Sequence, residues 1–237
     1  MKGFKTEPSE IGVQFVGTKT ALSSTQVAGV VQQDNWNTFS ASATGTALND
    51  DTGTATTATL TFSPNQSYFG GNLNDGVPGD AILTSGEIYN GWPNSGSGAY
   101  QGTSITVSNI PYARYDVYVY ADTDTSNRLQ TVELTPTGGS ASYQSYNLDN
   151  ALTTWTISNN TWNGSGTAPT LANANYSEFT GITPNGFKLL FGAPGNGAIN
   201  GIQIVQASAV PEPATLGLMV LAGVGILLAK RRHTKQA

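Results

Sequence analysis

The chain of 237 residues has no cysteine and a single histidine, His233, near its carboxyl end. The absence of cysteine excludes disulfide frameworks, thiolate metal sites and cysteine nucleophiles. Because the remainder of the chain has no histidine, it can hold neither a Ser-His-Asp triad nor a histidine metal site. The largest hydrolase classes are therefore excluded.

Charged residues are also scarce, at 11% of the chain against roughly 25% in ordinary soluble domains. Residues 1–210 contain six Lys or Arg and fourteen Asp or Glu, a net charge of −8, whereas the last 27 residues carry +3. The few basic residues of the acidic part are scattered, so they offer no patch for a phosphate backbone. We therefore expect no nucleic-acid binding.

Residues 10–207 show apolar residues at alternate positions, in short runs bounded by Gly, Pro, Asn or Asp. This period of two is typical of strands with one buried face, and the short spacing between the runs leaves no room for crossover helices. It predicts an all-β domain, an antiparallel jelly-roll-like β-sandwich of about 10–13 strands. The clearest runs are Ile11/Val13/Phe15, Ala58/Leu60/Phe62, Ile105/Val107, Tyr115/Val117/Val119, Val132/Leu134 and Ile202/Ile204.

Sixteen consecutive uncharged residues, 214–229, follow a short linker, and a cluster of Lys and Arg comes directly after them. A helix of this length is ~24 Å long, so it spans the ~30 Å hydrocarbon core with local thinning of the bilayer. We predict a linker at 208–213, a transmembrane helix at 214–230 and a basic tip at 231–237. The positive-inside tendency places the tip in the cytoplasm and the sandwich across the membrane.

Three features occur in fixed order at this end: the linker sequence Val-Pro-Glu-Pro at 210–213, the hydrophobic segment, and Lys-Arg-Arg at 230–232. This arrangement resembles the PEP-CTERM sorting signal of Gram-negative bacteria. The resemblance implies recognition by an exosortase, cleavage near the Pro-Glu-Pro motif, and transfer to the cell surface or to an exopolysaccharide matrix. It further implies that the sorting machinery reads Pro211, Glu212, Pro213, Arg231 and Arg232.

Proteins with this signal also begin with a secretory signal peptide. Residues 1–9 include Lys2 and Lys5, but no apolar segment of 7–15 residues follows them. Either the start is misassigned or truncated, or the carboxyl-terminal helix is the only membrane signal. We favour the first alternative, because residues 11–17 already have the pattern of an opening strand.

The sequence Tyr-Ala-Asp-Thr-Asp-Thr-Ser-Asn at 120–127 follows a predicted strand and contains alternating oxygen-bearing side chains. Asp122, Asp124 and Ser126 could converge on a calcium ion, which takes six to eight oxygen ligands. The segment lacks the glycine and the twelfth-position glutamate of an EF-hand, and a polar hairpin turn explains the same residues. Calcium is the only cofactor that the sequence suggests.

Aromatic residues beside Asn, Gly and Ser give a second candidate site. Tyr89, Trp92 and Trp162 lie in turn-like surroundings, where a flat ring can stack on a sugar while neighbouring side chains bond its hydroxyl groups. We predict that Trp36 and Trp155 belong to the core instead, and that Tyr118 and Tyr120 pack across strands.

The sequence thus predicts an exported surface or matrix protein, anchored in the membrane before an exosortase processes it. Its sandwich has a structural or carbohydrate-binding role, with exopolysaccharide or other glycans as partners, and we expect no enzymatic activity. Two alternatives stay open. One is a carbohydrate-active enzyme that uses two carboxylates, and the other is a calcium-stabilised adhesive module.

Overall fold

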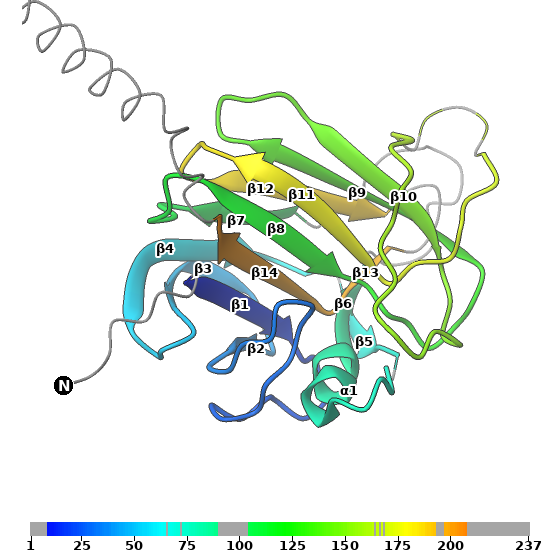
Figure 1. The fold of residues 1–237 in the computed structure, drawn as a ribbon, viewed down its shortest axis with the longest axis horizontal. Coiled ribbons are helices and arrows are strands. Elements are labelled where there is room, and N and C mark those ends of the chain that lie inside the picture. Colours follow the sequence, from blue (N-terminus) through cyan, green and yellow to red (C-terminus); the bar gives the residue numbers. More distant parts are fainter. Residues whose placement is uncertain are drawn as a thin grey trace, which may run out of the picture. The chain divides into compact units, whose positions relative to one another are not determined.

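The computed structural model describes residues 9–64, 66–71, 73–89, 104–163, 165, 167, 169–192 and 197–207. Residues 1–207 form one compact unit and residues 208–237 form a second. The described residues of the first unit form fourteen strands and one short helix (Figure 1). The expectation of an all-β fold with antiparallel sheets is confirmed, with one strand more than the predicted range.

One sheet has five strands in the order β11-β8-β14-β1-β2. All its pairs are antiparallel except β1 with β2, which run parallel. The first and last strands of the unit, β1 and β14, are neighbours within this sheet, with Ile11 opposite Ile204 and Val13 opposite Ile202. The strands are β1 (Glu10–Phe15), β2 (Asn37–Phe39), β8 (Tyr115–Tyr120), β11 (Tyr176–Ile182) and β14 (Gly201–Gln206).

The second sheet has six strands in the order β10-β9-β12-β7-β4-β3, all antiparallel. A third sheet of three short strands, β13-β6-β5, lies with helix α1 at one end of the unit (Figure 1). The remaining elements are β3 (Ala43–Asn49), β4 (Ala55–Phe62), β5 (Gln66–Phe69), α1 (Pro78–Thr84), β6 (Gly86–Tyr89), β7 (Ser104–Ser108), β9 (Arg128–Pro136), β10 (Ser142–Leu148), β12 (Phe187–Gly192) and β13 (Ala198–Ile199).

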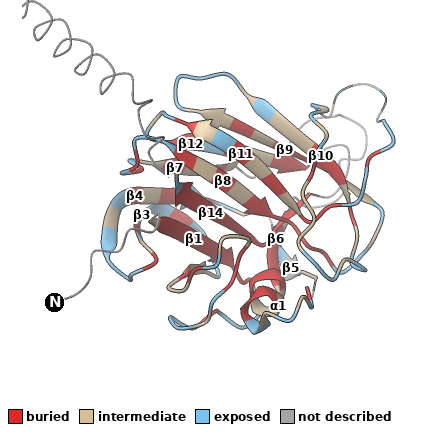
Figure 2. Cartoon of the chain, viewed as in Figure 1, coloured by how far each residue is buried: buried red, intermediate tan, exposed pale blue. Residues whose placement is uncertain are grey.

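The two larger sheets pack face to face and share one hydrophobic core. Alternate residues of each strand point inward, so β-branched and aromatic side chains from both sheets meet between the layers. Phe15 of β1 contacts Phe62 of β4 edge to face, with ring centroids 4.9 Å apart. The strands that the sequence predicted from alternation contribute most of this core (Figure 2).

Strand β1 is buried on both faces, although its alternation predicts one solvated face. The segment between β1 and β2, together with α1, covers the outer face of the sheet at this end. The Gln14 side chain joins β1 to both covering segments. Its amide N–H donates to the Ile82 carbonyl of α1 at 2.9 Å, and its amide oxygen accepts the Leu22 N–H at 2.9 Å. Trp36 packs on the same face, as predicted.

Helix α1 was not predicted, because a seven-residue helix that starts with Pro-Gly is too short to show a helical period. Proline is favoured in the first turn, where its missing N–H has no intrahelical partner. Gly79 allows the helix to approach the chain closely, since a Cβ there would lie 2.0 Å from the Val27 carbonyl oxygen. In the part of the chain that the structure describes, no helix is long and apolar enough to cross a bilayer. The predicted transmembrane helix at 214–230 lies outside the described residues.

Candidate functional site

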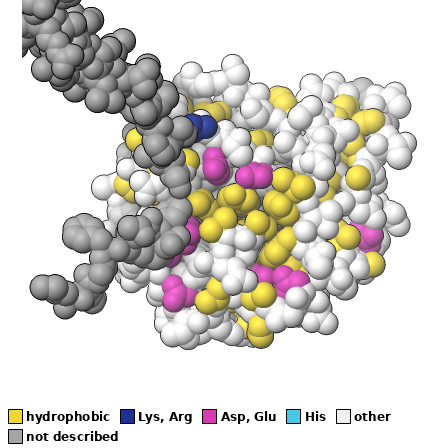
Figure 3. Space-filling model, in the orientation of Figure 1, with side chains coloured by type: hydrophobic (Ala, Val, Ile, Leu, Met, Phe, Trp, Pro, Cys, Tyr) yellow, Lys and Arg dark blue, Asp and Glu magenta, His cyan; other side chains and the backbone are white. Residues whose placement is uncertain are grey.

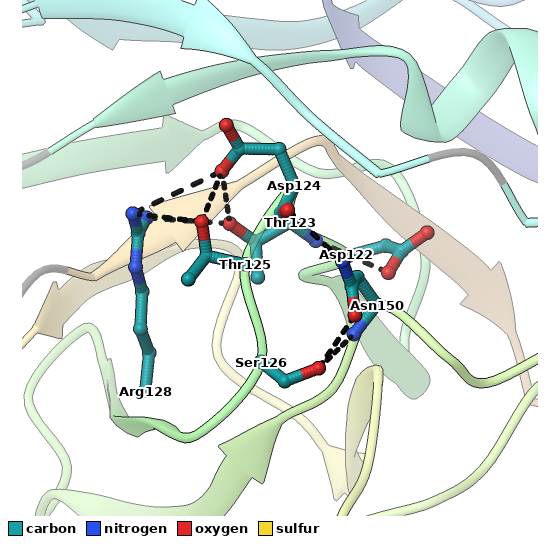
Figure 4. A network of polar contacts seen from close by, with 7 residues as sticks. All are labelled: Asp122, Thr123, Asp124, Thr125, Ser126, Arg128 and Asn150. Carbon is teal, nitrogen blue, oxygen red and sulfur yellow. Dashed lines mark hydrogen bonds and ion pairs between the residues drawn. The ribbon is translucent and has the colours of Figure 1, made fainter.

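The loop after β8 carries the three predicted calcium ligands (Figure 4). Asp122 is buried, and its backbone N–H donates to the side-chain oxygen of Asn200. One Asp122 carboxylate oxygen accepts the N–H of Thr123 at 3.1 Å. Asn200 is a structural hub, because its amide also donates to the Thr84 and Gly86 carbonyls, both at 2.9 Å.

Asp124 and Ser126 face other partners. The Asp124 carboxylate lies 3.8 Å from the guanidinium of Arg128 and accepts the hydroxyl of Thr125 at 3.0 Å. The Ser126 hydroxyl points the other way, 2.6 Å from Asp149 Oδ1 and within bonding distance of Asn150. The three side chains therefore do not converge on one point in this arrangement (Figure 4). Over the described ranges, no three Asp, Glu, His or Cys side chains are grouped closely enough to hold a metal ion.

Glu87, on β6, is one of the carboxylates that a two-carboxylate enzyme could use. Its side chain is fully buried, and among the described residues neither carboxyl oxygen has a hydrogen-bond partner. Burial, aided by the negative charge of Asp124 and opposed by Arg128, raises the pKa of Glu87 to about 8. Glu87 is therefore largely protonated at neutral pH.

Asp80, in α1, is a second buried carboxyl, and it ties the helix to the loops. It accepts the Gly29 N–H at 2.6 Å and the indole N–H of Trp155 at 3.1 Å. Burial raises the pKa of Asp80 to about 7, against the lowering effect of the Gly29 hydrogen bond. Both acids are closed to solvent. In this conformation neither carboxyl group can therefore reach a substrate.

The predicted sugar-contacting aromatics are spread over the unit. Trp92 lies outside the described residues. Trp162 is half-buried, and its indole N–H donates to the Ser165 carbonyl at 2.7 Å. Tyr89 is half-buried at the end of β6, opposite Ala198.

A separate aromatic cluster lies on the outer face of the five-stranded sheet, where hydrophobic side chains gather over β8 and β14 (Figure 3). Tyr118 and Tyr120 both pack against Tyr176 of β11, with centroid distances of 6.3 and 6.5 Å. The predicted packing across strands is thus confirmed. Trp155 contacts Tyr120 at 4.7 Å but is only half-buried, at the edge of the cluster.

A groove of about 650 Å³ lies between β10 and β11, the edge strands of the two larger sheets. Its lining includes the buried residues Leu134, Phe179 and Ile182 together with the polar residues Gln144 and Thr161. Sequence reasoning missed this groove, because its walls come from β10 and β11, which are distant in the sequence and are brought together only when the two sheets pack.

Ala207 is the last described residue, and its N–H donates to the Arg114 carbonyl at 3.0 Å. Two residues later a family profile, the PEP-CTERM protein-sorting motif, matches residues 209–232. The chain carries a PEP-CTERM protein-sorting motif. The match includes the predicted Pro-Glu-Pro and Arg-Arg residues, all of which lie outside the described residues. No curated protein and no solved structure shows significant similarity to the chain.

The PEP-CTERM motif implies an exported protein that is sorted to the cell surface, with an exosortase as its processing partner. It covers the carboxyl-terminal unit and says nothing about the activity of the sandwich.

Proposed function

We propose that the chain is a non-enzymatic surface or matrix protein, tethered by a transmembrane helix at 214–230 until an exosortase cleaves it near Pro211–Pro213. Its jelly-roll-like sandwich then serves a structural or carbohydrate-binding role in the cell envelope or the biofilm matrix. The observation that carries this proposal is the PEP-CTERM motif directly after the last described residue of the folded unit.

Two features support a role without catalysis. The single histidine lies in the basic tip, beyond the motif, so it is not part of the sandwich. The two acids with strongly raised pKa values, Asp80 and Glu87, are closed to solvent. The alternative of a two-carboxylate enzyme needs two acids facing one cleft, whereas Glu178 is the single acid that lines the groove between β10 and β11.

The sorting part is tested by expressing the tagged full chain in a host with an exosortase, next to a Pro211→Ala/Pro213→Ala variant. We expect the parent chain to be shortened and to reach the surface fraction, and the variant to accumulate at full length in the membrane fraction. Equal processing of both chains would show that the Pro-Glu-Pro residues are not read.

The carbohydrate-binding part is tested on a glycan array, with Trp92→Ala and Trp162→Ala as the variants. Loss of binding in either variant would support the predicted stacking on these rings. Binding to no glycan at all would leave a purely structural role for the sandwich.

A further inference from the structure

Strands β10 and β11 are edge strands of the two larger sheets (Figure 1), and the groove is lined by residues of both. Leu134, Phe179 and Ile182 are buried residues at its floor. A bulge in β11 shapes one wall, and Gly181 allows it with a φ of 71°. The side chain of Asp116 fixes this bulge by accepting the Gly181 N–H at 2.7 Å.

Gln144 is the most informative residue of the groove. It alternates with Tyr146 and Leu148, which belong to the core, so its side chain points between the sheets. Its amide oxygen is buried and has no hydrogen-bond partner among the residues that the structure describes. Buried acceptors are rarely left unpaired in proteins, so the site favours a ligand that donates a hydrogen bond there.

The rest of the lining is mostly polar. It includes the hydroxyl-bearing residues Ser142, Thr161 and Thr183. Glu178 also lines the groove, but its side chain points to the outer face of the five-stranded sheet, toward Tyr118. Among the described residues, no lysine, arginine or histidine lines the groove. It therefore offers no counter-charge to an anionic ligand and favours a neutral ligand that is rich in donors.

We propose that this groove binds a short stretch of a neutral polysaccharide, which deepens the carbohydrate-binding role proposed above and rests on it. A sugar ring has an apolar C–H face for Leu134, Phe179 and Ile182 and hydroxyl donors for the Gln144 oxygen. The volume falls within the range of small-molecule sites, roughly 300–1,000 Å³. Tyr89 and Trp162 are not among the residues that line it.

The test is isothermal titration calorimetry on the full chain, kept in lauryldimethylamine oxide because this detergent contains no sugar. The neutral probes are cellohexaose, laminarihexaose and mannohexaose. A hexagalacturonate is the anionic probe, and an eight-residue peptide of alternating Val and Thr tests addition of a strand to the sheet edges. We expect binding of at least one neutral probe and none of the other two.

One variant locates the site and keeps the size of the side chain. Gln144→Leu removes the buried acceptor and should raise the Kd for the bound glycan at least tenfold. Thr46→Ala, on β3 at the opposite edge, is the matched control and should bind like the parent chain. Gln144→Leu should melt at the same or a higher temperature, which separates lost binding from lost folding.

Three results would overturn the proposal. If a neutral glycan binds the parent chain and Gln144→Leu equally, the groove is the wrong site, although carbohydrate binding stands. If no neutral glycan binds, the groove has no such ligand and the sandwich is structural, while sorting is judged separately by export. Tighter binding of the hexagalacturonate or the peptide would assign the groove to that class of ligand instead.

Discussion

Replacing Glu87 by glutamine should change how the stability of the sandwich depends on pH. Glu87 is fully buried, its two carboxyl oxygens have no hydrogen-bond partner in the described part of the chain, and its pKa is raised to about 8 from an ordinary value of 4.5. In the folded protein the carboxyl therefore keeps its proton up to about pH 8, whereas the unfolded chain releases it near pH 4.5. Glutamine has nearly the same shape and cannot ionise.

The sign follows from proton linkage. Between pH 4.5 and 8 the folded state holds more protons than the unfolded state, so the free energy of unfolding falls as pH rises. The stability is fully present below pH 4.5, and the decline ends above pH 8, where both states are ionised. A difference of about 3.5 pH units, at about 1.36 kcal/mol per unit, corresponds to a loss of about 5 kcal/mol.

The assay is urea unfolding of residues 1–207, followed by tryptophan fluorescence at several values of pH between 4.5 and 8.5. Asp80 is present in both proteins and also loses stability with rising pH, because its pKa is raised to about 7. The informative quantity is therefore the stability of the parent minus that of Glu87→Gln, which should fall by about 5 kcal/mol across the range. A difference that stays constant with pH would refute the reasoning.

Three further predictions concern packing, the Asn200 hub and calcium. Phe15→Ala should lower the free energy of unfolding, measured with urea, by about 3–5 kcal/mol, because it removes a buried ring that contacts Phe62. Val27 is exposed, so Val27→Ala should change the free energy of unfolding by less than about 1 kcal/mol. Losses of similar size in the two variants would contradict this prediction. Asn200→Asp should lower the free energy of unfolding in the same assay by about 3 kcal/mol or more, because a carboxylate would face two carbonyls that now accept hydrogen bonds. An unchanged urea midpoint would show that these two hydrogen bonds do not stabilise the fold. If calcium binds at residues 122–126, calcium chloride should raise the melting temperature above that in EDTA, and identical melts would end the calcium prediction.

The strands could be predicted from the sequence because their signal is local. Val117 and Val119 alternate with polar or outward-facing residues, and this pattern alone places them in the core. The full burial of β1 could not be predicted in this way, because it depends on a segment and a helix that fold over the outer face. Helix α1 was missed for a related reason, since tertiary contacts such as the one from Gly79 to Val27 define so short a helix.

The candidate sites show the same limit more strongly. Asp124 and Ser126 are close in sequence, but their side chains turn to different partners, Arg128 and Asp149, and the alternating pattern does not reveal this. The burial of the Glu87 carboxyl likewise could not be predicted, because it depends on the pairing of β6 with β5 and β13. The sorting signal, in contrast, was predicted from sequence, because its motif, hydrophobic segment and basic cluster are contiguous.

The central claim is that the chain is exported and processed at its carboxyl end. Intact-mass measurement of the protein recovered from the surface and matrix fractions of its host tests this most directly. The account predicts a species that ends near Pro211–Pro213 and has lost residues 214–237, with or without an attached group. A species in the soluble cell interior that retains all of residues 209–237 would contradict it.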